Sequence, residues 1–244
     1  MKYATQEISE GRFEYTPEIS NDELGALSYS FREMAERLKR LESLHLDANP
    51  LTRLPGGRAI EDVLQNRLDA KGPLAFCLLD MDNFKAFNDH YGYASGSELI
   101  KETARVIEKS VRSYGAPDDF IGHIGGDDFV LITSPERSLV ICNEVIQGFD
   151  SMAPLHYTEE DRGRGYIISK NRQGDEVQFP LMTLSIAVVT NLHRRLTNTV
   201  EVGEIAAELK EYAKLIPGSV YVVDKRRKDE APAVSVALDL MTRG

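Results

Sequence analysis

The segment LAFCLLDM, residues 74–81, is an apolar run interrupted by Asp80, and a second acidic residue, Asp82, follows it. Its length and its lack of alternation predict a strand that is buried on both faces. An unpaired carboxylate inside such a strand is costly, so Asp80 must lie where the strand ends or hold a cation. A lone D-x-D pattern is more typical of a capping aspartate, and the next motif argues against that interpretation.

A second acidic pair, Asp127 and Asp128, follows two glycines between the apolar runs FIGHI, residues 120–124, and FVLIT, residues 129–133. Paired glycines accept positive φ angles, so this pattern predicts a β-hairpin. If the hairpin lies beside the strand at 74–81, the acidic side chains meet at one edge of a sheet. Carboxylates together with substrate phosphates suit Mg²⁺, and two such ions would activate a hydroxyl group and stabilise a pyrophosphate leaving group.

Helical and strand patterns alternate from Leu51 onward, which predicts an α/β domain with a mixed central sheet flanked by helices. We expect helices over residues 58–70, 95–113, 136–149 and 202–215. We expect strands over residues 74–81, 120–124, 129–133, 181–190 and 219–224. The Gly- and Arg-containing segment 158–176 is predicted to be irregular.

Residues 1–46 follow a different pattern. Capping residues at 20–22 begin a predicted helix that runs to about Leu46. Its apolar positions alternate in spacing between three and four residues: Leu24, Leu27, Phe31, Met34, Leu38 and Leu41. A narrow apolar seam with charged flanks favours a parallel coiled-coil dimer over a helix packed on its own domain. This long helix would precede the α/β domain at 47–228, and residues 229–244 would form a C-terminal tail.

The composition excludes several classes of protein. A protein that binds nucleic acid through the phosphate backbone needs a basic surface, and the net charge here is −10, so we expect no nucleic-acid partner. Cys77 and Cys142 lie inside apolar runs, which indicates buried thiols in a reducing, cytoplasmic compartment. The chain has no apolar run of membrane-spanning length and no signal-peptide pattern, so we do not expect it to enter a membrane by itself.

Three motifs resemble the GGDEF family of diguanylate cyclases: NPLTRLPGGRAIE at 49–61, LDMDNFKAFNDHYGYASGSELI at 79–100 and IGGDDFV at 124–130. Weaker similarity continues to about residue 224. The resemblance implies a nucleotidyltransferase that uses Mg²⁺ or Mn²⁺ to condense two nucleoside triphosphates with release of pyrophosphate. It also implies a homodimer with facing active sites, because each domain binds only one triphosphate.

The resemblance also assigns roles to single residues. Asp80, Asp127 and the Met81 carbonyl would bind the metal ion. Asp127 and Asp128 would be the catalytic carboxylates, with Asp127 as the base for the attacking hydroxyl. The triphosphate would contact Asn83, Phe84, Lys85 and Lys214. The nucleotide base would be recognised by Asn88 and Ser97.

Besides Ser97, which is considered below, the sequence departs from the family pattern at four places. Asp128 stands where the family has Glu, and His123 stands where an Arg usually precedes the hairpin. The segment 217–219 replaces the Arg that usually follows the late-helix Lys. The R-x-x-D register of the inhibitory product site reads Ala-Pro-Asp-Asp at 116–119, which predicts no product inhibition of that kind. Because His123 and the segment 217–219 each replace an arginine of the family pattern, phosphate binding is expected to be rebuilt.

Ser97 is the departure with the largest predicted consequence. Diguanylate cyclases place an Asp there that accepts hydrogen bonds from guanine and rejects adenine. A hydroxyl group can donate or accept, so it tolerates either purine. The substitution at Ser97, together with the GGDDF-like motif, resembles the hybrid promiscuous (Hypr) subgroup of the family. Enzymes of this subgroup make 3′,3′-cyclic AMP-GMP from ATP and GTP, with c-di-GMP as a side product. The alternatives are an ordinary diguanylate cyclase that makes c-di-GMP only, and a non-catalytic GGDEF signalling module.

Residues 21–41 resemble the second half of a HAMP signalling module, whose first helix normally follows a transmembrane segment. This leaves two alternatives open. Either Met1 is a native start, or the chain is the cytoplasmic part of an inner-membrane receptor that contacts the membrane only through an upstream segment.

Overall fold

The computed structural model describes residues 29–30, 32–34, 47–170 and 174–226. The chain divides into two compact units, Met1–Ala48 and Asn49–Gly244, each of which is described by itself. In the first unit, residues 29–30 and 32–34 are helical. The rest of the predicted helix with its coiled-coil seam lies outside the described residues, as does the tail at 229–244.

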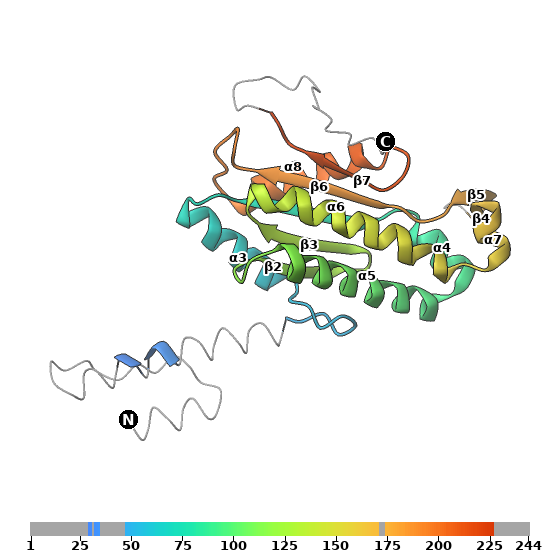
Figure 1. Ribbon diagram of the computed structural model, residues 1–244, viewed down its shortest axis with the longest axis horizontal. Coiled ribbons are helices and arrows are strands. Elements are labelled where there is room, and N and C mark those ends of the chain that lie inside the picture. Colours follow the sequence, from blue (N-terminus) through green and yellow to red (C-terminus); the bar gives the residue numbers. More distant parts are fainter. Residues whose placement is uncertain (1–28, 31, 35–46, 171–173, 227–244) are drawn as a thin grey trace. The chain divides into compact units, whose positions relative to one another are not determined.

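The second unit is built on a five-stranded sheet with the order β2-β3-β1-β6-β7 (Figure 1). The strands are β1 (Ala75–Met81), β2 (Phe120–Gly125), β3 (Asp128–Thr133), β6 (Leu184–Thr190) and β7 (Val220–Val223). The central strand β1 runs antiparallel to β3 and β6, whereas β7 runs parallel to β6. The sheet is therefore mixed and mostly antiparallel, which confirms the predicted α/β class.

Helices cover both faces of this sheet. The helices of this unit are α3 (Gly57–Ala70), α4 (Phe84–Tyr91), α5 (Tyr93–Tyr114), α6 (Pro135–Met152), α7 (Glu159–Arg164) and α8 (Thr199–Ala213), with a 3-10 turn at Ala153–His156. Buried apolar side chains join α4, α5 and α6 to one face of the sheet, and α3 and α8 to the other. Helices α5 and α6 run side by side (Figure 1).

Two parts of the sequence prediction are wrong. Residues 84–91 form α4, a helix that the pattern does not predict because eight residues give little periodicity. Residues 158–176 are not irregular throughout, since Thr158 accepts a hydrogen bond from the Asp161 N–H and begins α7. After α7, β4 (Tyr166–Lys170) pairs with β5 (Glu176–Pro180) in a separate two-stranded sheet.

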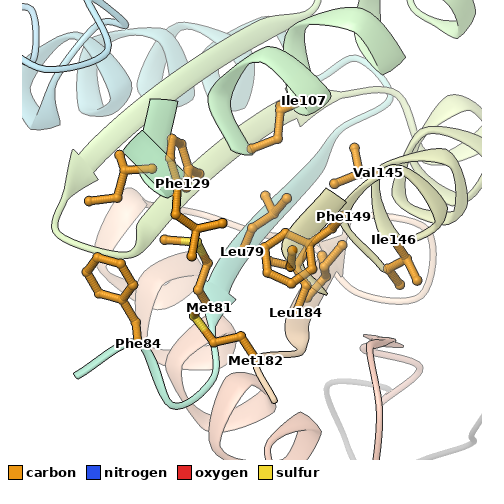
Figure 2. Close-up of a cluster of buried hydrophobic side chains, with 14 of the residues drawn as sticks. Leu79, Met81, Phe84, Ile107, Phe129, Val145, Ile146, Phe149, Met182 and Leu184 are labelled. Atoms are coloured by element: carbon orange, nitrogen blue, oxygen red, sulfur yellow. The ribbon is translucent and has the colours of Figure 1, made fainter. Parts of the chain in front are cut away.

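The side chains of β1 alternate between two apolar cores. Leu79 and Met81 lie in the core beneath α4, α5 and α6 (Figure 2). Phe76 and Leu78 lie in the opposite core, beneath α3 and α8. Because both faces are covered, every residue of β1 is buried, as predicted. The same alternation turns Asp80 toward the face that α8 covers.

The two cysteines are free and buried, as predicted, with the Sγ atoms of Cys77 and Cys142 3.9 Å apart. Among the helices that the structure describes, none combines the length and apolar character needed to cross a membrane.

Candidate active site

Three carboxylates lie where β1 meets the β2–β3 hairpin. Asp80, the last residue but one of β1, is the register partner of Asp128, the first residue of β3. Asp127 lies in the turn, after Gly125 and Gly126, whose φ angles are 149° and 59°. Both angles favour glycine, so the two glycines allow the tight turn that brings Asp127 to the sheet edge. The structure thus brings together the acidic residues of the two sequence motifs.

Lys210 of α8 and Lys214 at the C-terminal cap of this helix offset part of this negative charge. The Lys214 Nζ lies 2.7 Å from Oδ1 of Asp80. The Lys210 Nζ lies 3.0 Å from Oδ2 of Asp80 and 2.9 Å from Oδ1 of Asp128. The two lysines share one face of the chain because they are four residues apart. Lys214 is a predicted phosphate ligand, whereas the sequence analysis missed Lys210, for which the four-residue spacing is the available signal.

The burial of this cluster changes the protonation of its members. Asp80 has a side chain only 4% exposed. Burial and the negative charge of Asp80 raise the pKa of Asp127 above its ordinary value. Burial also raises the pKa of Asp128, although the hydrogen bond from Lys210 acts in the opposite direction. Burial disfavours the charged form of Lys210, but its bonds to Asp128 and Asp80 prevail and raise its pKa. The cluster therefore favours additional positive charge near Asp127.

The donor chemistry of the cluster fits a hard divalent cation. Asp80 and Asp127 offer carboxylate oxygens, and across residues 47–170 and 174–226 no ion pair engages Asp127. Within those same residues, no three acidic, His or Cys side chains are already arranged around a cation position. A Mg²⁺ or Mn²⁺ ion at Asp80 and Asp127 would therefore displace at least one ammonium group from Asp80. The excess of carboxylates over lysines favours this exchange.

Asp82, the second acidic residue after β1, anchors the end of the strand. Its carboxylate accepts hydrogen bonds of 2.8 Å from the hydroxyl groups of Thr183 and Ser185. Its backbone N–H also donates to the Thr183 carbonyl at 2.8 Å. These bonds tie the chain that follows β1 to the start of β6, and so they fix the position of Asp80.

The predicted phosphate-binding segment lies at the start of α4. Asn83 has a φ of 62° and precedes the helix without capping it through its side chain. Phe84 is buried in the core (Figure 2), so it can contact a ligand only through its backbone. Lys85 is exposed and pairs with Asp89 one turn further along α4. The Lys85 ammonium group therefore pairs within its own helix and not with the carboxylate cluster.

The two predicted base-binding residues lie on neighbouring helices, Asn88 on α4 and Ser97 on α5. The side-chain oxygen of Asn88 is buried, and no described residue donates a hydrogen bond to it. A Cβ atom at Gly96 would overlap that oxygen, so the glycine allows α5 to approach Asn88. Ser97 follows Gly96 and is half-buried. A buried acceptor without a donor is rare in folded proteins.

His123, at the position of the family's arginine, has a structural role. It is 1% exposed and stacks on Phe129 with the ring centroids 4.3 Å apart. Its Nε2 lies 3.0 Å from the Gly126 carbonyl and its Nδ1 lies 2.9 Å from the Thr52 hydroxyl. Because a carbonyl can only accept, Nε2 donates and Nδ1 accepts. Burial lowers the pKa of His123, so the ring stays neutral at pH 7. It holds the hairpin turn and cannot act as a cationic phosphate ligand.

The other departures are also engaged elsewhere. The Ser219 hydroxyl donates to Asp150 and accepts a 3.0 Å hydrogen bond from the Leu184 N–H. Asp119, the last residue of the product-site register, has a side chain that is fully buried and lies 2.7 Å from Arg137 of α6. The register thus lacks its arginine, and its aspartate is already paired.

Comparison with known proteins gives matches to two family models. Residues 46–165 match the model described as "Diguanylate cyclase, GGDEF domain", and residues 1–40 match the HAMP domain model. The chain is 29% identical over 161 residues to diguanylate cyclase DgcP of Pseudomonas aeruginosa, covering 60% of this chain and 23% of the relative. It is 33% identical over 88 residues to diguanylate cyclase DgcS of Shewanella oneidensis, covering 35% and 28% respectively. The chain thus spans about a quarter of the length of these relatives.

Solved structures share the fold. Diguanylate cyclase SiaD of Pseudomonas aeruginosa, in complex with its activator SiaC, superimposes with a TM-score of 0.60 at 20% identity, covering 91% of this chain and 75% of that one. The coiled coil and GGDEF domain of DgcB from Caulobacter crescentus, in complex with c-di-GMP, gives 0.53 at 21% identity, covering 82% and 94%. Residues 46–165 are therefore similar in sequence to the GGDEF domain of diguanylate cyclases, and the chain shares the fold of the solved GGDEF structures.

Proposed function

We propose that the chain is a divalent-cation-dependent nucleotide cyclase that condenses two nucleoside triphosphates into a cyclic dinucleotide and releases pyrophosphate. The observation that carries this proposal is that Asp80 and Asp128 pair with Lys210 and Lys214 at the sheet edge where Asp127 lies beside them. Carboxylates that hold a cation and lysines that bind phosphate are the two components needed for phosphoryl transfer. The names of the relatives support the same reaction class.

The carboxylates would divide the work between binding and proton transfer. Asp80 and Asp127 would hold Mg²⁺ or Mn²⁺, with the Met81 carbonyl as a further ligand. When bound, the ion offsets the charge that develops on the phosphates. Asp127 would accept the proton of the 3′-hydroxyl that attacks the α-phosphorus, and its raised pKa suits a proton acceptor. Asp128 would retain the negative charge of the family's glutamate and hold Lys210.

The triphosphate would bind between the start of α4 and the end of α8. No side chain caps α4 at Asn83, so the N–H groups of its first turn, from Phe84 onward, are free to bind phosphate. Lys85 would exchange Asp89 for the phosphates. Lys214 has a side chain 34% exposed, so it can turn toward a phosphate when the metal ion takes its place at Asp80.

The product depends on the base pocket formed by Asn88 and Ser97. Synthesis of c-di-GMP from GTP alone fits the relatives' names at least as well as any other product. Ser97 favours a second candidate, 3′,3′-cyclic AMP-GMP from ATP and GTP with c-di-GMP as a side product. Its hydroxyl can serve either purine, whereas a carboxylate accepts hydrogen bonds only and therefore selects guanine.

The proposed reaction requires two copies of the chain. Each domain would supply one triphosphate, so a homodimer would bring two sites face to face. In this proposal residues 47–228 are the catalytic domain, residues 1–46 are a HAMP-type signalling helix, and residues 229–244 are a tail. Pairing of the helices would raise the local concentration of one catalytic domain near the other. The site would work in the cytoplasm, with the HAMP module relaying a signal from a membrane receptor.

Product analysis tests this proposal directly. The purified chain is incubated with equal ATP and GTP and with Mg²⁺, and the products are identified by chromatography and mass spectrometry. A cyclic dinucleotide with stoichiometric pyrophosphate, absent when Mg²⁺ is chelated, is the expected result. No product from a chain shown to be dimeric would favour the non-catalytic module.

Replacement of Ser97 tests the base pocket. Ser97→Asp should shift the products toward c-di-GMP by about tenfold or more, because the new carboxylate rejects adenine. Ser113→Asp adds the same charge at an exposed position of the same helix and serves as the control. An unchanged ratio of adenine to guanine in the products would show that the selectivity lies elsewhere.

A further inference from the structure

Lys210 occupies a position that bridges two carboxylates of neighbouring strands. Its Nζ lies 3.0 Å from Asp80 and 2.9 Å from Asp128, which are register partners on β1 and β3. Two like charges directly opposite each other in a sheet repel. The ammonium group removes this repulsion and is within hydrogen-bond distance of both side chains.

The surroundings of Lys210 hold it there. Its side chain is 17% exposed, half the exposure of the Lys214 side chain. The neighbouring Leu209 and Ala213 are buried, so α8 is fixed against the sheet at this point. Lys214 ion-pairs with Asp80 and lies at the C-terminal cap of α8. Of the two lysines, Lys214 is therefore the one that can leave Asp80 for a ligand, and Lys210 is the one that stays.

The place between two carboxylates is also where a second divalent ion would bind. Two-metal sites hold their ions about 3.5–4 Å apart and need a carboxylate that faces both ions. Asp80 could supply that carboxylate only if its second oxygen were free, and that oxygen accepts Lys210. The position between the two carboxylates is therefore already filled by a cation that belongs to the chain itself, the Lys210 ammonium group.

We propose that Lys210 is a built-in counter-cation that bridges Asp80 and Asp128 and takes the place of a second divalent ion, so that each site holds one ion, at Asp80 and Asp127. This inference rests on the proposed function, which requires a divalent ion at that position. In this proposal Asp128, the second aspartate of the IGGDDFV motif, binds Lys210 and not the metal ion. It also explains how the shorter carboxylate of Asp128 is accommodated, because the lysine reaches it across the strand pair.

The test measures Mn²⁺ binding to the full chain without nucleotide, with free Mn²⁺ quantified by electron paramagnetic resonance. The wild-type chain is expected to bind one Mn²⁺. Lys210→Met removes the charge and keeps most of the length, so it should bind Mn²⁺ about tenfold more tightly or take up a second ion. Lys210→Arg retains the charge and should behave as wild type. Lys101→Met removes an exposed lysine that pairs with Glu98 and is the control.

Unchanged or weaker Mn²⁺ binding by Lys210→Met would overturn the role of Lys210. Lys210→Met combined with Asp128→Asn removes the ammonium group together with the carboxylate it neutralises, and this double variant should return to one ion with near wild-type affinity. If the double variant instead bound like Lys210→Met, Asp128 would not be the lysine's partner in solution. A wild-type chain that takes up no Mn²⁺, with or without a non-hydrolysable GTP analogue, would contradict the proposed function itself. Thermal melting of each variant shows that it is folded.

Discussion

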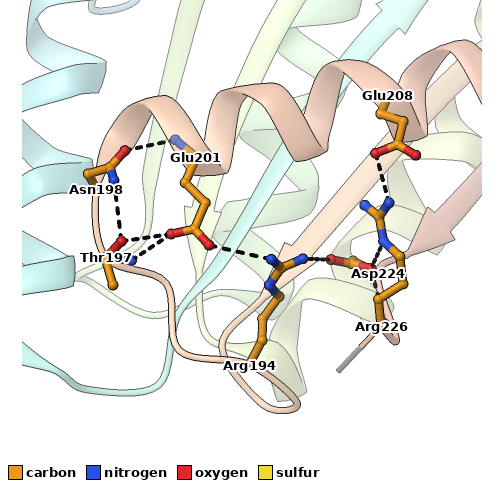
Figure 3. A network of polar contacts seen from close by, with 7 residues as sticks. All are labelled: Arg194, Thr197, Asn198, Glu201, Glu208, Asp224 and Arg226. Atoms are coloured by element: carbon orange, nitrogen blue, oxygen red, sulfur yellow. Dashed lines mark hydrogen bonds and ion pairs between the residues drawn. The ribbon is translucent and has the colours of Figure 1, made fainter. Parts of the chain in front are cut away.

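Two clusters of charged side chains along α8 each combine three carboxylates with two cations, and they differ in how these groups are paired. At the C-terminal end of α8, Asp80 and Asp128 pair with Lys210 and Lys214, and Asp127 lies beside them. At the other end and along its side, three carboxylates meet two arginines (Figure 3). The members of this second set, here called the arginine network, are Arg194, Glu201, Glu208, Asp224 and Arg226. The net charge is equal, so the difference between the two clusters lies in geometry and in the type of cation.

Every carboxylate of the arginine network is paired. Asp224, with a side chain 1% exposed, lies 2.8 Å from Nε of Arg226 and 3.5 Å from Arg194. Arg226 also reaches Glu208 at 2.7 Å, and Arg194 reaches Glu201 at 3.4 Å. Glu201 further accepts hydrogen bonds from Thr197, which closes the network around the start of α8. No described carboxylate in this set is left for a ligand.

The active-site cluster differs in leaving one carboxylate, Asp127, without an ion pair among the described residues. Lysine is a compact charge on a flexible stem, whereas arginine presents a planar fork that holds several acceptors at fixed angles. Lysine pairs can therefore be exchanged for a metal ion or a phosphate, and arginine pairs resist exchange. Equal net charge therefore gives a fully paired structural network along α8 and an exchangeable binding site at the C-terminal end of the helix.

The largest effect is expected at the unpaired carboxylate. Asp127→Ala should lower the rate of pyrophosphate release by at least about a thousandfold, because it removes both a metal ligand and the proposed base. The fold should persist, since Asp127 lies in a turn and has no ion-pair partner among the described residues. Pyrophosphate release and circular dichroism measure the two properties. Turnover within tenfold of wild type would refute the assignment.

A large loss of stability is expected at the centre of the arginine network. Asp224→Asn leaves two arginines without their shared buried carboxylate and should lower the free energy of unfolding by about 3 kcal/mol. Asp118→Asn is the matched control, because Asp118 also pairs with two arginines but its side chain is 60% exposed. The control should change stability by less than about 1 kcal/mol. Urea unfolding measures both, and equal losses would contradict the contrast.

A smaller effect isolates the type of cation. Arg226→Lys keeps the charge but cannot reach Asp224 and Glu208 together, so the free energy of unfolding should fall by about 1 kcal/mol. Arg105→Lys, at an exposed ion pair with Glu102, is the control and should have almost no effect. If Arg226→Lys were as stable as wild type, the fork geometry would not explain the difference between the two clusters.

The smallest effect has the opposite sign. The pKa of Asp127 is raised in the folded chain, so the folded state binds this proton more tightly than the unfolded state, and stability falls as the pH rises through that raised pKa. Asp127→Asn removes this loss. Without metal at pH 7 the variant should be more stable than wild type, by less than about 1 kcal/mol because water screens the half-exposed side chain. Urea unfolding at pH 7 and pH 3 should show the gain only at pH 7.

Much of the fold could be read from local patterns. The buried strand at 74–81, the Gly-Gly hairpin and the helices at 58–70 and 202–215 all appear within a residue or a few of their predicted bounds. The short helices α4 and α7 were not predicted, because eight and six residues are too few to show a helical periodicity. The roles of His123 and Lys210 were not predicted for another reason. Both depend on partners that are distant in the sequence, such as Thr52 for the histidine and Asp80 for the lysine.

The sequence by itself determined the α/β class, the acidic motifs and the likeness to the GGDEF family, since these depend on residue type, local spacing and turn chemistry. Only the tertiary structure decided how charge is distributed among those motifs. It turned Asp80 and Asp128 toward α8, gave them Lys210, and left Asp127 free of ion pairs within the described residues. The physical reason is that an ion pair depends on distances of a few ångströms between segments far apart in the chain, and no local pattern encodes those distances.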